Sequence, residues 1–364
     1  MDFNRRKAMG LACGALGATA LPRIAMANFA PRPADWRNFE IQTRVNMLLN
    51  GATAQAWIPV PSVTEGDWMR AGDTTWTGNA DHISLKTDDN GTLFVHAIWL
   101  ETKGEATLDV TSSASARNRR VNLNGPGLDK PLSAEERMRF TAPTDLIPTD
   151  GIVRDTAVSI VKGATSDVEK ARRIYDWVVD STERNPETRG CGLGDIASML
   201  TMGDLTGKCA DLNSLYVGLA RAVELPARDV YGLRVAPSAF GYKSLGAGSP
   251  DVTKAQHCRA DVFLDGFGWT PVDPADVRKV VLEEPPKTLT LQDAEVEDVR
   301  RALFGAWEGN WIAYNFTHDV VLPGAPRSRI PFLMYPQATI GDTWLDELDP
   351  ENFAYSISAR ETSG

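Results

Sequence analysis

A helix pattern followed directly by strand patterns most restricts the folds open to this chain. The helix begins GKCADLNSLYVGLARAVELPAR at residue 207, and strand patterns follow at 228–235, 259–264 and 268–273. The apolar residues at helical spacing are Leu212, Leu215, Tyr216, Leu219 and Val223. A turn signal separates the last two strands, so we expect them to form a hairpin. Helices ahead of antiparallel strands predict an α+β core over residues 149–285.

A second helix pattern precedes the first within this core. Ser166 and Glu169 have the spacing of a capping box, in which a hydroxyl and a carboxylate satisfy free amides at a helix start. Apolar residues behind them recur at helical spacing: Val168, Ala171, Ile174, Tyr175 and Val178. The sequence therefore predicts a helical lead-in to the segment that begins at residue 207.

The N-terminal part carries strand patterns without helix patterns. Alternating apolar residues mark two strands: Phe39, Ile41, Val45 and Met47, then Ala106, Leu108 and Val110. Residues 92–100 form a more continuous apolar run. These patterns predict an all-β, sandwich-like domain over 28–125. Residues 126–148, rich in Gly, Pro and charge, are predicted to be a linker.

The C-terminal part gives weaker signals. Residues 292–304 have a helix pattern, and WIAYNF, DVVL and FAYSI have strand patterns. We expect residues 286–364 to complete the core sheet or to cover it.

The N-terminus has the pattern of an export signal. Arg5, Arg6 and Lys7 precede an apolar run over 11–21, and Ala25-Met26-Ala27 provides small residues for cleavage. The paired arginines resemble a twin-arginine signal. We therefore expect residues 1–27 to be a signal peptide and the protein to be periplasmic or otherwise exported. Because no later apolar run is long enough to cross a bilayer, no integral membrane segment is expected after cleavage.

The overall charge argues against two classes of partner. The chain has 38 Lys and Arg against 48 Asp and Glu, a formal net charge of −10. Nucleic acids and anionic membranes attract basic proteins, so neither is expected to bind this chain by bulk charge.

Three cysteines follow the signal: Cys191, Cys209 and Cys258. An odd number leaves at least one thiol unpaired within the chain. A disulfide between Cys191 and Cys258 would leave Cys209 free, but sequence does not fix the pairing. Cys209 stands at the start of the predicted helix, where unpaired backbone amides and the helix dipole favour a thiolate.

One histidine and one aspartate are predicted to lie near each other. His257 begins one strand of the hairpin and Asp273 ends the other, so both fall at the same end. A carboxylate orients an imidazole, and the imidazole can take the proton of a thiol. Of the other histidines, His96 lies in an apolar strand and is interpreted as structural, and His82 lies among polar turn residues. His318 has no candidate nucleophile near it in sequence.

Several motifs in this region resemble one family. G-K-C-A-D before an apolar helix, L-P-A-R, H-x-R-A-D-V-F-L and G-W-T-P-V-D-P occur in order. Together they resemble the transglutaminase-like superfamily. The resemblance implies a papain-like α+β core in which the nucleophile helix packs on an antiparallel sheet. It also implies that Cys209 is the nucleophile, His257 the acid/base and Asp273 the orienting carboxylate. Cys258 after the histidine departs from the family pattern.

The function expected is that of an exported thiol enzyme acting on amide or peptide bonds through a thioester. Peptidase, amidase and transamidase chemistry share the first half-reaction, so the sequence leaves them open. A peptide or protein substrate is the expected partner, and no cofactor or metal is predicted. The resemblance to the animal enzymes does not extend to an acidic, calcium-binding loop.

Two alternatives remain open. The chain could be a periplasmic binding or assembly module with a vestigial triad. Cys191, Cys209, His257 and Cys258 could also be four zinc ligands, although the chain has no C-x-x-C pair and two of these residues are adjacent. The oligomeric state is not predicted.

Overall fold

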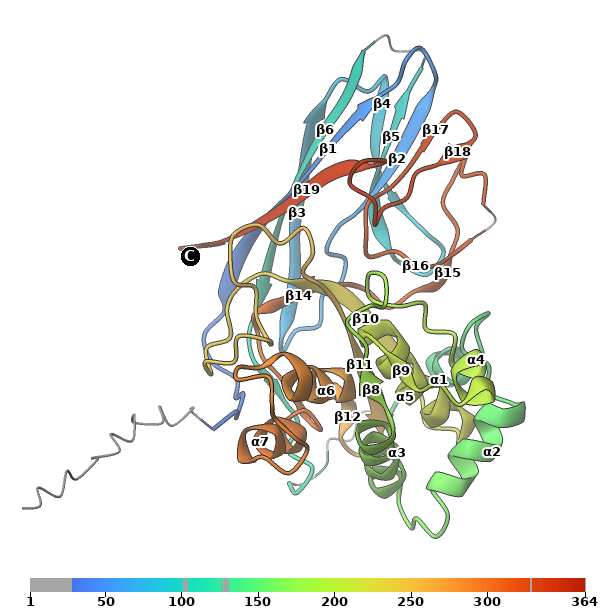
Figure 1. The fold of residues 1–364 in the computed structure, drawn as a ribbon, viewed down its shortest axis with the longest axis vertical. Helices are drawn as coiled ribbons and strands as arrows, with labels where there is room; N and C mark the ends of the chain where they lie inside the picture. Colours follow the sequence, from blue (N-terminus) through green and yellow to red (C-terminus); the bar gives the residue numbers. More distant parts are fainter. Residues whose placement is uncertain (1–27, 101–103, 126, 128–130, 328, 364) are drawn as a thin grey trace, which may run out of the picture.

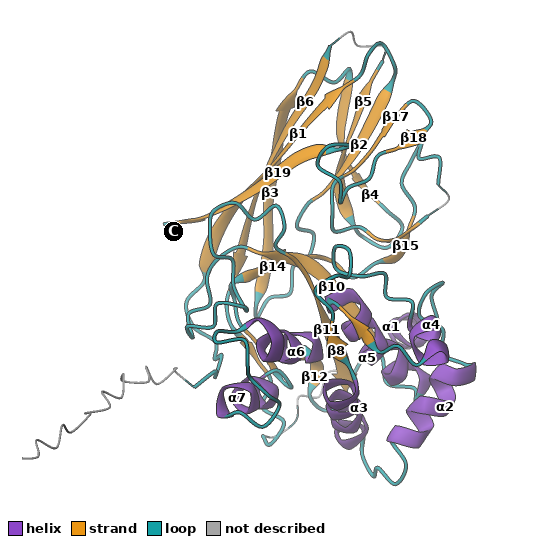
Figure 2. Ribbon diagram, viewed as in Figure 1, coloured by secondary structure: helices purple, strands orange, loops and turns teal. Residues whose placement is uncertain are grey.

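The structure is a computed structural model that describes residues 28–100, 104–125, 127, 131–327 and 329–363. The predicted signal peptide, residues 1–27, lies outside the described residues. Helices gather at one end of the molecule, and strands and loops make up the other end (Figures 1 and 2). Within the described part of the chain, no helix is both long enough and apolar enough to cross a membrane.

Two sheets form the strand-rich end. One has the order β19-β1-β6-β3 and the other β18-β17-β2-β5-β4. The strands of the first are β1 (Arg37–Leu48), β3 (Met69–Gly78), β6 (Glu105–Ala116) and β19 (Ala354–Thr362). Those of the second are β2 (Ala54–Pro59), β4 (His82–Thr87), β5 (Leu93–Trp99), β17 (Gln337–Ile340) and β18 (Thr343–Trp344).

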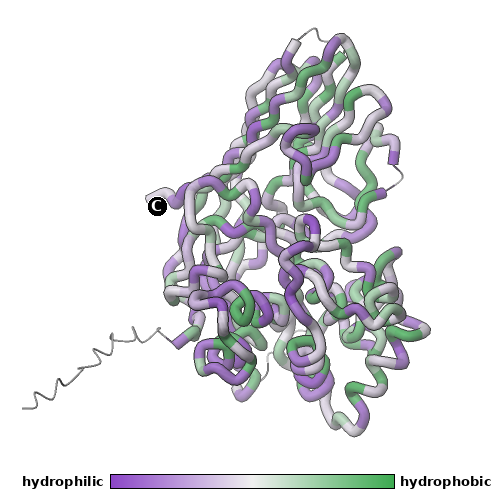
Figure 3. Tube along the Cα trace, in the orientation of Figure 1, coloured by the Kyte–Doolittle hydropathy of each residue, from purple (hydrophilic) through white to green (hydrophobic). Residues whose placement is uncertain are grey.

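A shared apolar core holds these two sheets together. Val45 and Leu108 from one sheet and Ala56 and Trp99 from the other are buried in the same cluster. Buried and more exposed residues alternate along β1 and β6, so each of these strands turns one face to this core. Figure 3 shows hydrophobic and hydrophilic residues interleaved at this end of the molecule. The predicted all-β, sandwich-like architecture is confirmed.

The strands of these two sheets contain two histidines, His96 and His82. His96 is buried in β5, and its Nε2 lies 2.9 Å from Gln55 Oε1. This agrees with the structural interpretation. His82 begins β4 and is exposed, so the expectation that it lies in a turn is wrong.

The helical end is built around a third antiparallel sheet, with the order β12-β11-β10-β14. Its strands are β10 (Ala227–Arg234), β11 (Gln256–Leu264), β12 (Gly268–Val272) and β14 (Trp311–Asn315). The helices are α1 (Ala134–Thr141), α2 (Gly151–Ile160), α3 (Asp167–Ser181), α4 (Ile196–Met202), α5 (Cys209–Ala222), α6 (Pro274–Glu283) and α7 (Ala294–Ala302). Short pairs complete the fold: β7 (Arg119–Arg120) with β13 (Ala306–Trp307), β8 (Glu183–Arg184) with β9 (Thr206–Gly207), and β15 (His318–Val320) with β16 (Ile330–Phe332).

Helix α5 lies at the centre of this end. It packs against β10 and β11 on one side and against α2, α3 and α6 on others. Every residue from Cys209 to Ala222 is buried. The sequence predicted a single apolar stripe, so the helix is more enclosed than expected. Gly218 shows how close the packing is, because a Cβ there would lie 2.1 Å from Ile196 Cδ1.

The capping box of α3 forms in a modified way. Ser166 Oγ accepts from the Glu169 N–H at 3.2 Å, as predicted. The Glu169 carboxylate, however, accepts from the N–H of Thr165 rather than from that of Ser166. Two backbone N–H groups at the helix start therefore have side-chain acceptors, but the second belongs to Thr165, one residue earlier than in a standard capping box.

The C-terminal residues divide between the two ends of the molecule. β14 joins β10 in the core sheet. β17 and β19 instead pair with β2 and β1 in the sandwich. Strand patterns carry no information about so distant a partner, so this pairing was not predicted. Helix α1 also lies within the predicted linker, and the domain boundaries remain predictions.

A buried charge cluster joins the two ends. Asp261 of β11 is fully buried and accepts from Arg119 at 2.8 Å and from Arg228 at 2.9 Å. Arg228 also pairs with Glu65, which precedes β3. Arg228 is therefore an ion-pair partner within the fold rather than part of the lining of the cavity at Cys209. Because the guanidinium groups are out of water, they depend on these carboxylates.

We predict that Asp261→Asn lowers the free energy of unfolding by about 3 kcal/mol or more, since it leaves buried arginines without full compensation. Asp265→Asn, on the same hairpin, is the matched control, because its ion pair with Arg137 is exposed. The control should cost about 1 kcal/mol at most. Chemical denaturation measures both, and equal losses would contradict the account.

Candidate active site

Cys209 is the first residue of α5, and its side chain is 4 % exposed. The preceding residue, Lys208, is held by a 2.9 Å hydrogen bond from its N–H to Asp211 Oδ2. The N–H of Cys209 belongs to the first turn of the helix, so it has no acceptor within the helix. The helix start thus provides a thiol, a free donor and a positive potential at one point.

A glycine-rich loop brings Cys191 to the same point. Asp211 Oδ1 accepts from the N–H groups of Leu193 and Gly194, both at 3.0 Å. The N–H of Ala210 donates to the Cys191 carbonyl at 2.8 Å. Gly192 is required here, because its φ is +90° and a Cβ would lie 1.8 Å from Asp211. Asp211 therefore anchors the loop as well as the helix start.

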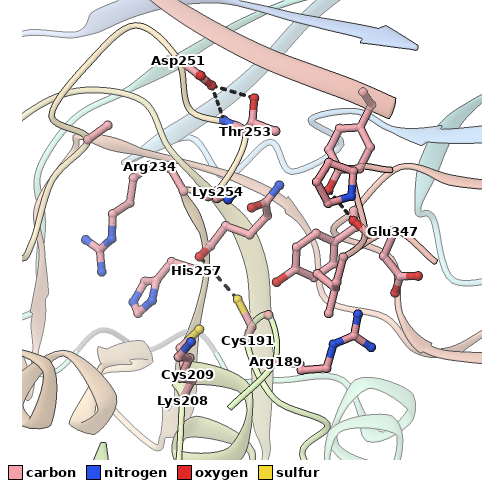
Figure 4. Close-up of a pocket in the computed structure, with 18 of the residues that line it drawn as sticks. Arg189, Cys191, Lys208, Cys209, Arg234, Asp251, Thr253, Lys254, His257 and Glu347 are labelled. Atoms are coloured by element: carbon pink, nitrogen blue, oxygen red, sulfur yellow. Dashed lines mark hydrogen bonds between the residues drawn. The ribbon is translucent and has the colours of Figure 1, made fainter. Parts of the chain in front are cut away.

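His257 and Asp273 meet as the sequence predicted. His257 Nε2 lies 2.8 Å from Asp273 Oδ2, and both side chains are buried. Asp273 follows β12 and caps α6, where its Oδ1 accepts from the Asp276 N–H at 3.0 Å. Because Nε2 is committed to this pair, Nδ1 is the ring nitrogen left for the thiol of Cys209, which His257 contacts. Figure 4 shows Cys209 and His257 in the same pocket.

The packing behind His257 fixes its strand. The indole Nε1 of Trp311 donates to the His257 carbonyl at 3.0 Å. Gly232 faces His257 across the β10–β11 ladder, and a Cβ there would lie 2.4 Å from the Trp311 ring. The absent side chain makes room for the indole, so β11 is held firmly where the imidazole begins.

Three further polar residues belong to this network and were missed by the sequence interpretation. Asp276 Oδ1 lies 3.4 Å from His257 Nε2 and 2.5 Å from Arg234 Nη2. Asn213, one turn after Cys209 on α5, donates to Asp273 Oδ1 at 3.2 Å and to the Cys258 carbonyl at 2.9 Å. Of these three residues, only Asp276 had a signal in the sequence. Pro274 and an acid three residues after Asp273 predict the start of α6.

The surroundings of His257 favour its protonated form. Burial and the nearby Arg234 lower its pKa, but the carboxylates of Asp276 and Asp273 outweigh both and raise it to about 9. The imidazole is therefore charged at neutral pH.

The pKa of the Cys209 thiol is lowered instead of raised. Burial raises the pKa of its thiol, but hydrogen bonds from Cys191, Cys258 and His257 outweigh burial and hold the pKa well below its ordinary value. Hydrogen bonding to Cys209 raises the pKa of Cys191, and burial raises that of Cys258. These shifts favour a thiolate on Cys209 beside two protonated thiols and an imidazolium, a combination suited to nucleophilic attack on a carbonyl carbon.

All three cysteines in the described residues are free, so the Cys191–Cys258 disulfide left open by the sequence is not formed in this structure. Their sulfur atoms all lie within 4.8 Å of one another. Three thiols at this spacing form a donor set that a thiophilic metal could use. Within the proposed four-residue zinc set, His257 could offer Nδ1 only, since its Nε2 bonds Asp273.

The site opens into a cavity of about 580 Å³. Cys209 and His257 lie in its wall, and Tyr335 and Phe353 close it from the C-terminal segment. His318 lies outside this cavity, 3.2 Å from Asp229, so it is separate from the thiol.

Comparison with known proteins agrees with the fold and the motifs. A model of the transglutaminase-like superfamily matches residues 154–274. The chain belongs to the transglutaminase-like superfamily. An uncharacterized protein of Haemophilus influenzae is 34% identical over 322 residues, which cover 84% of this chain and 85% of that protein.

A solved structure extends the likeness to nearly the whole chain. It is that of a candidate cysteine protease from Cytophaga hutchinsonii, with a TM-score of 0.51 and 17% identity. The match covers 90% of this chain and 99% of that one. It bears on the fold, and with the family match it confirms the predicted α+β, transglutaminase-like core with a β-rich N-terminal region.

We predict that iodoacetamide alkylates Cys209 at a rate that stays high at pH 6, where an ordinary thiol is protonated. The rate should fall only as pH drops through the lowered pKa of Cys209. Peptide mapping identifies the labelled residue, and Cys209→Ala provides the blank. A rate that rises in proportion to hydroxide through pH 6–8 would contradict the shifted pKa.

Proposed function

We propose that this chain is an exported, cysteine-dependent enzyme that cleaves amide or peptide bonds through a thioester on Cys209. The observation that carries the proposal is the buried hydrogen bond between His257 and Asp273 next to a thiol at a helix start. Few structural roles need an ion-paired thiol and imidazole on the wall of an open cavity. Export rests on the N-terminal pattern of residues 1–27.

The first half-reaction follows from the protonation states. The Cys209 thiolate attacks the carbonyl carbon, and the carbonyl π electrons move to oxygen. The N–H of Cys209 donates to the oxyanion that forms. His257 then gives its proton to the leaving nitrogen, the C–N bond breaks, and an amine departs from a thioester.

The second half-reaction restores the enzyme. The neutral imidazole takes a proton from water, and the oxygen attacks the thioester carbonyl. Collapse of the intermediate breaks the C–S bond, releases a carboxylic acid and returns the thiolate beside an imidazolium. Asp273 holds the ring so that Nδ1 faces the sulfur in both half-reactions.

An amine in place of water would make the enzyme a transamidase. Both reactions use the same thioester, and we favour hydrolysis because water is abundant in the periplasm. The fold neighbour described as a candidate cysteine protease agrees with this choice. Product analysis with and without a primary amine separates the two reactions.

We predict that peptides carrying a chloromethyl ketone form one covalent adduct with the chain, on Cys209. Intact mass and peptide mapping measure it, and Cys209→Ala abolishes it. Cys191→Ala is the matched thiol control and should still be labelled. Labelling that survives Cys209→Ala, or that is indifferent to the attached peptide, would favour the alternative of a binding module with a vestigial triad.

We predict that His257→Ala lowers kcat on a cleaved peptide by 100-fold or more, in line with the usual contribution of a general acid–base group (about 10²–10⁴). His82→Ala is the control, because His82 is exposed on β4. It should leave kcat within about twofold. Equal activity of His257→Ala and wild type would remove His257 from the mechanism.

The alternative that the three thiols bind a metal can be tested directly by alkylation. A bound metal would occupy Cys209 and block its alkylation. Treatment with a strong zinc chelator before labelling should leave the rate unchanged if the cluster serves as a nucleophile with two hydrogen-bond donors. A marked rise, with stoichiometric zinc by elemental analysis, would support the metal site instead.

A further inference from the structure

The walls of the catalytic cavity have a charge opposite to that of the chain. The chain as a whole has a formal net charge of −10. The charged residues that line the cavity, His257 aside, are six basic ones, Arg184, Arg189, Lys208, Arg234, Lys254 and Lys279, and two acidic ones, Asp251 and Glu347. A basic cavity in an acidic protein calls for an explanation, because chance would favour carboxylates.

The three arginines do not account for the excess charge, since each has a carboxylate partner. Arg184 pairs with Glu283, Arg189 with Asp346 at 2.8 Å, and Arg234 with Asp276 at 2.5 Å. Their charges are largely used within the protein.

The lysines are less well matched. Lys279 lies 3.8 Å from Glu283, a carboxylate that it shares with Arg184. Burial, followed by the repulsion of Arg234, lowers the pKa of Lys279 to about 8. The charge of this ammonium group is therefore only partly compensated, and an anion in the cavity would stabilise it.

Lys208 and Lys254 have no ion-pair partner among the carboxylates of the described residues. Lys208 immediately precedes Cys209, and Lys254 precedes His257 by three residues. Both line the cavity. Two ammonium groups without a salt bridge therefore precede the reacting pair, one on each chain segment that supplies it.

Neither acidic residue forms a salt bridge with Lys208 or Lys254. Asp251 accepts from the N–H and the hydroxyl of Thr253, at 3.0 and 2.6 Å, and its charge also attracts Lys254 without a direct ion pair. Glu347 acts on Arg189, whose pKa its charge raises after the larger effects of Asp346. Figure 4 shows Arg189 and Glu347 on one side of the cavity, Arg234 and His257 on the other, and Lys208 next to Cys209. Lys208 and Lys254 therefore carry the positive charge that no salt bridge offsets in this cavity.

We propose that the substrate is an acidic peptide, with a carboxylate near the scissile amide that is bound by Lys208 and Lys254. This inference rests on the proposed function and names its substrate class. A carboxylate beside a thiolate nucleophile is repelled by it, and the two lysines offset that repulsion while the reacting carbon approaches. A neutral peptide of the same shape lacks this attraction.

Paired electrophilic peptides test this charge preference directly. Chloromethyl ketone peptides that differ only by Glu or Gln at one position are compared for their second-order rate of Cys209 modification. We expect the Glu peptide to react about tenfold faster or more at one position at low salt. The advantage should shrink as ionic strength rises, since charges separated by solvent are screened.

The variants identify the residues responsible. Lys208→Gln with Lys254→Gln should bring the Glu-to-Gln ratio close to one, whereas Lys208→Arg with Lys254→Arg should keep most of it. Lys86→Gln, on an exposed position of β4 far from the cavity, is the matched control and should leave the ratio unchanged. A ratio at or below one in wild type at every position, or a ratio unaffected by the double Gln variant, overturns the proposal.

Iodoacetamide separates this failure from a failure of the proposed function. The reagent is small and neutral, so its reaction with Cys209 depends on the thiolate and not on the lysines. Rapid alkylation without a preference for Glu peptides would leave the enzyme proposal standing and remove the acidic substrate. Slow alkylation together with no peptide preference would count against both.

Discussion

The buried hydrogen bond between His257 and Asp273 is the interaction on which the rest of the site depends. Both partners are out of water, and their 2.8 Å contact sets which ring nitrogen faces Cys209. Asp273 is fixed in turn, since it caps α6 and accepts from Asn213 of α5. The nucleophile helix, the hairpin and the following helix therefore converge on one carboxylate.

The buried charges around the site are compatible with a stable fold because each has an oppositely charged partner. Asp276 lies between His257 and Arg234, and Arg259 stands 3.7 Å from Asp273. Removing one partner from such a network would leave a buried charge uncompensated, which is expensive in a medium of low dielectric constant. The thiolate fits the same rule, because an imidazolium and two protonated thiols surround it. The network thus stabilises the fold and sets the reactive protonation states together.

Sequence patterns predicted the site as far as its determinants are local. A helix start placed Cys209, and a hairpin placed His257 near Asp273. Asn213 and Arg234 were missed because their partners lie on elements distant in sequence. Asn213 of α5 bonds the Cys258 carbonyl of β11 and Asp273, and Arg234 of β10 pairs with Asp276 of α6. The enclosure of α5 on all sides was missed for the same reason. The pairing of β19 with β1 joins strands more than 300 residues apart, and alternation alone names no partner.

The central claim is that Cys209 and His257 form a thiolate–imidazolium pair at neutral pH. The most direct test is a nitrogen-15 NMR titration of the His257 ring in the wild-type chain and in Cys209→Ala. Both ring nitrogens should be protonated at pH 7, and the ring should titrate near pH 9. The pKa of His257 should fall in Cys209→Ala, because the neighbouring anion is lost. A neutral ring at pH 7, with a pKa that is the same in both proteins, would contradict the claim.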